Sequence, residues 1–355
     1  MRGGDIAIGW VSTWNEKCGI AVHSENILKN LKQDFLVFAP YEESLVREDE
    51  GFVRRCWSKN SKSFGDLIDR IREGGVTKLV VQHHPGYMLF RDLNSIILKL
   101  ADFEVEVTLA LHNTRERPRV FRSNRIDRAV PGMKLCKNVI VHQTGDVDRL
   151  HRMGVTENVR LVPLGVYPPP SGTSGIPIPE GRVLGTFGFL LPHKGFPELI
   201  QSFSMMDEWD YLVMLCSERE ESADTLIECE ERVKSLGLDG RVILNTEFLD
   251  QDVAISTLSE LDLVVFPYQN TKESASAAIR MAVAAGSAIA VTPLEIFADV
   301  EGAIIMDGCS IEEMFSSLSR LQTSDLEDSK KNISEMRVAH QWPEISKRIS
   351  DLVIE

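Results

Sequence analysis

The sequence lacks paired cysteines, an excess of basic residues and any long apolar run. Its six cysteines stand singly, without CxxC pairs or the Cys/His spacing of metal sites, so we expect reduced thiols and no bound metal. Lys and Arg number 39 against 53 Asp and Glu, and the net charge of −14 argues against a general nucleic-acid binder. No apolar stretch approaches the roughly 18 residues of a membrane helix.

The bulk composition is that of a globular protein. Its 355 residues suffice for two domains, and 43% are hydrophobic while 26% are charged. The first residues enter a strand-like run without the charged and then apolar segment of a secretory signal. We therefore expect a cytoplasmic protein.

Short apolar, β-branched runs alternate with helix-period segments, which predicts an α/β fold with parallel sheets. The predicted strands of the first half are DIAIGWV from Asp5, DFLVFAP from Asp34, KLVVQHH from Lys78, EVTLALHN from Glu106 and KNVIVHQ from Lys137. Those of the second half are RVLGTFGFL from Arg182, YLVMLCS, RVILNTEF, LDLVVFPY and AIAVTP. Two doubly wound domains with a cleft between them is the simplest architecture.

A proline-rich segment separates the two series. Six prolines fall between Pro163 and Pro179, a density that neither a helix nor a central strand tolerates. We predict a first domain over 1–168, a linker over 169–181, a second domain over 182–338 and a final helix over 339–355.

Two strand-to-helix loops are suited to binding phosphate. In WVSTWNEKCGIAVHSENIL, Gly19 has no side chain to block a ligand from the following helix N-terminus, although it is equally a glycine needed only for the turn. In LGTFGFLLPHKGFPELIQSF, a strand ends at Pro192-His193-Lys194-Gly195. The Lys194 ammonium is placed to neutralise a diphosphate leaving group, and the alternative is a solvated lysine at a helix cap.

The segment FPYQNTKESASAAIRMAVAAG is the most informative. A buried-looking strand is followed by a polar loop with one carboxylate, Glu273, and by small residues before an alanine-rich helix. Such a loop lets a ligand approach backbone N–H groups while Glu273 accepts hydrogen bonds from hydroxyls. A sugar linked to a diphosphate matches both features, because its phosphates would meet the N–H groups and its hydroxyls would meet Glu273. The alternative for Glu273 is an acid at a helix N-cap.

Taken together, GFLLPHKGFPELIQSF and FPYQNTKESASAAIRMAVAAG resemble the donor-binding half of glycosyltransferase family 4, which are retaining enzymes of the GT-B fold. NEKCGIAVHSENIL, the LHNT loop and VRLVPLGVYP resemble that family's N-terminal half in order and spacing. The resemblance implies two Rossmann-like domains facing across a cleft, with the last helix, in WPEISKRISDLVIE, packing back on the first domain.

The resemblance also implies residue roles. Lys194 corresponds to the lysine that contacts the donor diphosphate, Glu273 to the first acid of a paired-glutamate motif that holds sugar hydroxyls, and His112 to a histidine facing the transferred sugar. The alternative for His112 is a hydrogen-bonded histidine at a strand end. The implied donor-binding set is Gly19, His193, Lys194, Glu273, Ser274, Ala275, Ser276 and Ala277.

The chain departs from the family pattern at two places. The second glutamate of the motif, eight residues after Glu273, is replaced by Met281, which cannot accept two strong hydrogen bonds from a ribose. Many members carry an arginine shortly before the lysine, where this chain has Phe189 and Leu190. Arg280 is a possible substitute cation, but the sequence does not place it at the site.

The loop QHHPGYM follows the third predicted strand, where such enzymes bind their acceptor. His83 and His84 are adjacent and therefore point to opposite faces of a strand, so at most one faces the cleft. His84, Arg115 and Arg117 are our candidate acceptor-side residues.

The sequence thus predicts a metal-independent retaining glycosyltransferase, or hexosyltransferase, acting in carbohydrate biosynthesis. Its partners would be a nucleotide-diphosphate sugar and a carbohydrate or lipid-linked acceptor, and no cofactor or nucleic acid is expected. One alternative is a non-catalytic GT-B binding or scaffold protein with a degenerate donor site, which the changes at Met281 and Phe189 favour. Another is a sugar-nucleotide epimerase on the same architecture.

A basic stretch stands out in this acidic chain. RERPRVFRSNRIDR, from Arg115 to Arg128, holds six arginines against two acids directly after LHNT. Charge runs are commonly solvated surface. A phosphorylated acceptor or peripheral contact with the anionic cytoplasmic membrane face is the functional interpretation.

We predict that replacing Arg117, Arg119, Arg122 and Arg125 by Gln weakens association with anionic vesicles or turnover of a phosphate-bearing acceptor, because the positive charge is lost. Vesicle co-sedimentation and acceptor kinetics measure the two effects. If neither changes, the stretch is solvated surface only.

Overall fold

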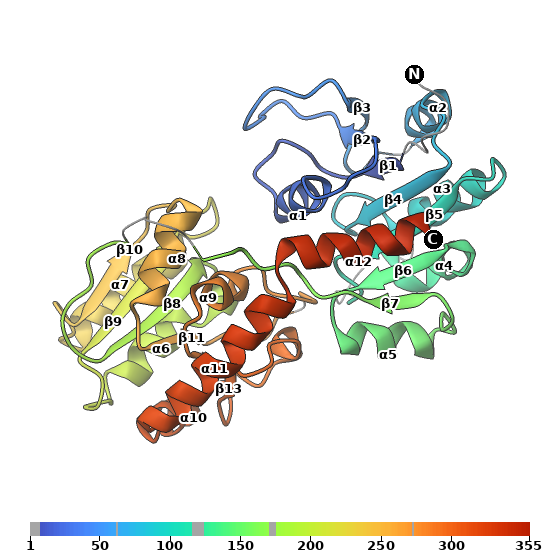
Figure 1. Cartoon of the computed structure of the whole chain (residues 1–355). Coiled ribbons are helices and arrows are strands. Elements are labelled where there is room, and N and C mark those ends of the chain that lie inside the picture. Colours follow the sequence, from blue (N-terminus) through green and yellow to red (C-terminus); the bar gives the residue numbers. More distant parts are fainter. Residues whose placement is uncertain (1–7, 62, 116–123, 170–174, 272) are drawn as a thin grey trace. The chain divides into compact units, whose positions relative to one another are not determined.

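The computed structural model describes residues 8–61, 63–115, 124–169, 175–271 and 273–355. The chain forms two compact units, each built on its own parallel β-sheet (Figure 1). The N-terminal unit comprises Met1–Gly165, Lys272–Ala275 and Trp342–Glu355, and the C-terminal unit comprises Val166–Thr271 and Ser276–Gln341. The predicted α/β class with two parallel sheets is confirmed.

The sheet of the N-terminal unit has seven strands within the described residues, all parallel, in the order β3-β2-β1-β4-β5-β6-β7. The strands are β1 (Ile8–Val11), β2 (Phe35–Pro40), β3 (Val53–Trp57), β4 (Lys78–His83), β5 (Glu106–Leu111), β6 (Asn138–Val141) and β7 (Val159–Leu161). The helices are α1 (Gly19–Leu28), α2 (Gly65–Glu73), α3 (Phe90–Ala101), η2 (Ile126–Ala129), α4 (Val130–Leu135), α5 (Thr144–Arg152) and α12 (Trp342–Ile354).

The sheet of the C-terminal unit has six parallel strands within the described residues, in the order β10-β9-β8-β11-β12-β13. They are β8 (Val183–Phe189), β9 (Tyr211–Ser217), β10 (Val242–Asn245), β11 (Leu263–Phe266), β12 (Ile289–Val291) and β13 (Ile304–Ile305). The helices are η3 (Pro192–Lys194), α6 (Phe196–Phe203), α7 (Ala223–Ser235), α8 (Gln251–Ser259), α9 (Ile279–Ala285), η4 (Glu295–Phe297), α10 (Ile311–Ser319) and α11 (Thr323–Ala339).

The apolar runs of the sequence form strands because helices cover both faces of each sheet. Every residue of β1 and of β11 is buried, as expected for central parallel strands. All ten predicted strands are present, and three short strands at or near sheet edges, β3, β7 and β13, were not predicted. In β3, the adjacent Arg54 and Arg55 interrupt the apolar pattern, which an edge strand tolerates.

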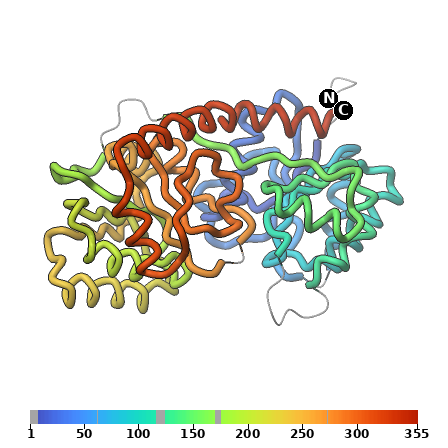
Figure 2. Tube along the Cα trace, turned by 90° about the horizontal axis from the view of Figure 1, so that it is seen from below, coloured from blue at the N-terminus to red at the C-terminus, as the bar shows by residue number. Residues whose placement is uncertain are grey.

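The last helix belongs to the N-terminal unit, and Figure 2 shows it as the red coil that ends at the C-terminus. The Lys78 ammonium of β4 donates to the Val353 and Ile354 carbonyls at 2.9 and 2.7 Å, and Asn138 donates to Leu352 at 2.7 Å. At the other end, a Cβ on Gly165 would overlap the indole of Trp342. Helix α12 is therefore attached at both ends. Among the described residues, no helix is long and apolar enough to cross a membrane.

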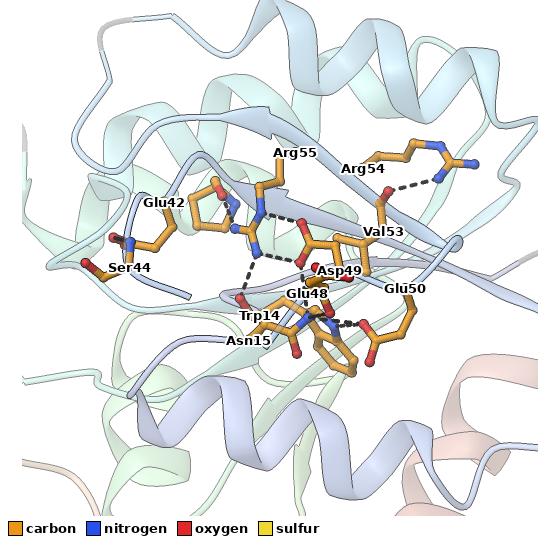
Figure 3. Close-up of polar contacts among 11 residues, drawn as sticks. Trp14, Asn15, Glu42, Ser44, Glu48, Asp49, Glu50, Val53, Arg54 and Arg55 are labelled. Atoms are coloured by element: carbon orange, nitrogen blue, oxygen red, sulfur yellow. Dashed lines mark hydrogen bonds and ion pairs between the residues drawn. The ribbon is translucent and has the colours of Figure 1, made fainter. Parts of the chain in front are cut away.

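The loop between β1 and α1, which leads to Gly19, is held by the loop between β2 and β3 (Figure 3). Arg55 donates to both carboxylate oxygens of Asp49, at 2.6 and 2.8 Å, and to the Trp14 carbonyl at 3.1 Å. Asn15 has a φ of 54°, which asparagine tolerates, and its carbonyl accepts from the Val46 N–H at 2.7 Å. The hydrogen bond from Arg55 lowers the pKa of the Asp49 carboxyl, against the opposing effect of partial burial.

We predict that Arg55→Gln loosens the loop between β2 and β3, because one guanidinium bonds this loop to the loop between β1 and α1. The free energy of unfolding of the N-terminal unit should fall by about 2 kcal/mol. Hydrogen exchange of the 41–52 segment measures it, since the amides of Tyr41 and Val46 are protected by bonds to neighbouring segments. The control is Arg54→Gln, because within the described residues the exposed Arg54 side chain bonds only to the nearby Gly51 and Val53 carbonyls. Equal exchange in the two variants would contradict the assignment.

Candidate functional site

In each sheet the strand order reverses at one point, between β1 and β4 and between β8 and β11. Ligands of open α/β sheets bind beyond the carboxyl ends of the strands at such switch points.

At the switch point of the C-terminal unit, the turn after β8 is locked onto the segment after β11. Gly195 has a φ of 72°, and a Cβ there would collide with the Pro267 carbonyl oxygen. The His193 carbonyl accepts from the Gln269 N–H at 2.8 Å. Glycine is therefore required at 195 both for its backbone conformation and for this close approach.

Lys194 lies in this turn and is only 6% exposed. Its ammonium lies 3.9 Å from the centroid of the buried Tyr268 ring, a cation–π contact. Lys194 is therefore not the solvated cap residue of the alternative interpretation. A buried ammonium is less screened by water and acts more strongly on a nearby anion.

Three further side chains gather at the same edge of this sheet, and sequence reasoning missed them as a group. The Arg219 guanidinium, after β9, lies 3.8 Å from the ring centroid of Phe189, the last residue of β8. Phe248, after β10, is 77% exposed and stacks near Phe189, with centroids 6.3 Å apart and planes 19° apart. Each of the three residues lies at or just after the end of a predicted strand, and this position was the signal that the sequence offered. The contacts among the three side chains depend on the strand order, which the sequence does not give.

The loop from Glu273 onward is divided between the two units. Glu273 is exposed, Ala275 is half-buried and Ala277 is exposed. Ser276 belongs to the C-terminal unit, where its hydroxyl is 3.2 Å from that of Tyr268 and accepts from the Ile279 N–H at 3.4 Å. Helix α9 begins only at Ile279, so residues 273–278 form a loop.

Ser274 groups with the N-terminal unit, in a polar network with the buried Thr114 and Asp146 and the half-buried Arg149. Its hydroxyl accepts from the Thr114 N–H at 3.2 Å and donates to the Asp146 carboxylate at 3.3 Å. Arg149 donates to the same carboxylate oxygen at 2.7 Å and to the Thr114 hydroxyl at 2.6 Å. These three partners lie far from Ser274 in the chain, so no spacing in the sequence links them to it.

The two residues after the ESASAAI segment are packing residues. Arg280 is 3% exposed and pairs with Asp299, and burial lowers the pKa of its guanidinium to about 10. It is not an exposed substitute cation. Met281 is partly buried against an apolar cluster that includes Phe266 and Val283, which explains why a thioether is accommodated there.

In the N-terminal unit, Gly19 is the first residue of α1. It does not have a positive φ, and a Cβ added there would meet no atom of the described residues within 4 Å. Neither the turn nor packing therefore requires glycine, which favours the interpretation that a ligand approaches here.

His112 lies just after β5, and its Nε2 is 2.7 Å from the Gln82 amide oxygen. Its ring centroid is 5.0 Å from those of both His23 and His142. Burial, with a smaller contribution from His142, lowers the pKa of His112 and of His23 well below the usual value. These two rings are neutral at pH 7, and the sequence analysis did not bring the three histidines together.

Of the two adjacent histidines proposed for the acceptor side, His83 is the last residue of β4 and His84 follows it. His83 is buried with its Nε2 2.8 Å from the Met88 carbonyl oxygen, and burial lowers its pKa to about 3. His84 is half-buried, and its Nδ1 accepts from the Gly86 N–H at 3.0 Å. The Arg115 N–H donates to the Asn113 side chain at 2.8 Å, whereas Arg117 and most of the basic stretch lie outside the described residues.

No protein-family model matches the chain. Among solved structures, HepE of Anabaena in complex with UDP matches with a TM-score of 0.75 at 14% identity, covering 98% of this chain and 99% of HepE. A glycosyltransferase of Rickettsia africae matches with 0.75 at 13% identity over 98% of both chains. Sucrose-phosphate synthase of Thermosynechococcus elongatus matches with 0.69 at 14% identity, also over 98% of both. These likenesses show that the chain has the two-domain GT-B fold.

Proposed function

We propose that this chain is a retaining glycosyltransferase that moves a sugar from a nucleotide-diphosphate donor to an acceptor hydroxyl on a glycan or a lipid-linked molecule. The observation that carries the proposal is Lys194, a buried ammonium held on Tyr268 at the switch point of the C-terminal sheet. The fold likeness to HepE, solved in complex with UDP, supports the nucleotide part of the donor.

In the proposed step the bond between the sugar C1 and the diphosphate oxygen breaks, and a bond from C1 to the acceptor oxygen forms on the same face. The acceptor proton passes to the departing diphosphate. Negative charge grows on that leaving group, and a positioned cation stabilises it more in the transition state than in the ground state. Lys194 fills this role without a metal ion.

Arg219 supplies a second cation at the same sheet edge. Its guanidinium lies on Phe189, at the position where many family members have an arginine. With Arg280 buried against Asp299, Arg219 is our candidate to contact the nucleotide phosphates. Glu273, exposed in its loop, accepts hydrogen bonds from the sugar hydroxyls.

In the N-terminal unit, Gly19 leaves the start of α1 open to a ligand, and His112, which matches a histidine facing the transferred sugar in the family it resembles, contributes a neutral ring. The Nε2 of His112 is engaged with Gln82, so the step as proposed uses no proton transfer by His112. We further propose that the protein acts in the cytoplasm, with peripheral membrane contact through the 115–128 stretch.

The second candidate is a GT-B binding or scaffold protein without activity. Met281, packed against an apolar cluster where the resemblance expects a ribose-binding acid, favours it. Calorimetry with UDP-, GDP- and ADP-sugars separates the two, because a protein without a working donor site shows no saturable binding.

We predict that Glu273→Ala lowers release of free nucleotide from the productive donor by about 100-fold in kcat/KM, since a contact to the transferring sugar is lost. Nucleotide release from the donor panel, with and without acceptor, is the measurement. The control is Glu301→Ala, which removes another exposed carboxylate. Unchanged release in the Glu273 variant would remove this residue from the site.

We also predict that Arg219→Gln weakens binding of the nucleoside diphosphate by about tenfold, or ~1.4 kcal/mol, because a charged hydrogen-bond donor is lost. The matched control is Arg182→Gln, since Arg182 makes a similar cation–π contact, 4.1 Å from the Trp209 ring, next to the amino end of β8. Calorimetry with UDP, GDP and ADP gives the affinities. An equal effect of both substitutions would attribute the loss to packing.

A further inference from the structure

Three histidines of the N-terminal unit converge from separate elements. His23 lies in α1, His112 follows β5 and His142 follows β6. One ring nitrogen of each lies within 4.8 Å of one on each of the others. Because β5 and β6 are neighbours, their carboxyl ends place two of the rings side by side, and α1 supplies the third.

Hydrogen bonds to acceptor oxygens determine which nitrogen carries the proton in two of these rings. His142 Nδ1 is 2.8 Å from the Val162 carbonyl oxygen, and His112 Nε2 is 2.7 Å from the Gln82 amide oxygen. Since both oxygens only accept, these nitrogens donate, and the lone pairs are on His142 Nε2 and His112 Nδ1. Metal-ligating histidines commonly donate their second N–H to such an oxygen, which orients the ring.

His23 has no such hydrogen bond. It is 5% exposed, and neither of its nitrogens has a hydrogen-bond partner within the described residues. A buried polar group without a partner is costly, and in native structures it calls for an explanation such as an ion. The ring lies 5.0 Å from His112, 5.4 Å from His142 and 5.3 Å from the Trp342 indole, measured between centroids.

We propose that His23, His112 and His142 bind a late first-row divalent cation, with Zn²⁺ as the best match. Imidazole nitrogens suit zinc, copper, nickel and iron, whereas Mg²⁺ and Ca²⁺ prefer oxygen ligands. Three histidines leave a fourth position for water.

The spacing of the rings is compatible with an ion after a small adjustment. Zinc–nitrogen bonds of about 2.1 Å place the ligand nitrogens of a tetrahedral site about 3.4 Å apart. One nitrogen from each ring lies within 4.8 Å of the other two, so three such nitrogens each reach this spacing by moving toward their centre by no more than about 0.8 Å. Small rotations of the side chains supply such a movement.

The ion would tie α1 to the carboxyl ends of β5 and β6, and so hold the helix that begins at Gly19 against the sheet. This role is separate from the proposed transfer step, which uses no nitrogen of His112. The inference shares His112 with the proposed sugar site, and because the metal-binding test measures no sugar transfer, failure of one proposal is distinguishable from failure of the other.

The test is metal binding by the whole protein after treatment with a chelator. We expect one Zn²⁺ per chain in competition with a chromophoric indicator, and visible absorption bands of four-coordinate Co²⁺ on cobalt addition. His23→Gln should weaken Zn²⁺ binding at least 100-fold. The control His151→Gln removes an exposed histidine of α5 and should leave binding unchanged.

Thermal unfolding supplies a second readout. At a free Zn²⁺ concentration 100-fold above Kd, the wild-type Tm should rise by about 5 °C, and the Tm of His23→Gln should not rise. X-ray absorption of the zinc-loaded wild type should show scattering from imidazole ligands and none from sulfur, which excludes binding by the cysteines.

Three outcomes would overturn the proposal. The wild type binds neither Zn²⁺ nor Co²⁺ at micromolar concentration, its absorption spectrum shows sulfur ligands, or His23→Gln binds zinc as tightly as the wild type. The first two need no variant, so they hold even if His23→Gln does not fold.

Discussion

The parallel order of the strands is the constraint on which every candidate residue depends. Parallel sheets are covered by helices on both faces, so polar side chains gather beyond the carboxyl ends of the strands. In the N-terminal unit this edge holds His83, the last residue of β4, and His112 and His142, which follow the neighbouring strands β5 and β6. In the C-terminal unit it holds Lys194 and Arg219. Their chemistry follows from one shared edge in each sheet.

These edges are rigid because their loops are tied to neighbouring segments. Gly195 lies against the Pro267 carbonyl, and the Lys194 ammonium contacts the Tyr268 ring. Arg55 bonds to both the β2–β3 loop and the β1–α1 loop. Side chains held in this way lose little further conformational freedom when a ligand arrives. Preorganisation of this kind matters most where charge develops during a reaction.

The sequence was sufficient for the fold, and it offered candidate residues one at a time without their neighbours. Apolar runs predicted ten strands. The turn at Lys194 was predicted because a strand pattern is followed there by a glycine and a helix pattern. The edge strand β3 was not predicted because two arginines interrupt its apolar pattern. The contact of Arg219 with Phe189 and the group of three histidines were not predicted for another reason. The residues of each group are far apart in the chain, and only the strand order brings them together. Spacing rules find sites whose ligands are close in sequence.

The last helix has a consequence for the order in which the protein is made. Helix α12 is bonded to β4 through Lys78 and to β6 through Asn138, and its Trp342 lies beside His23 and Gly165. A ribosome therefore synthesises the entire C-terminal unit before the N-terminal unit has all of its parts. During that interval the surface that α12 later covers stays open to other proteins, and the N-terminal unit, although it emerges first, cannot complete its fold until α12 has been made.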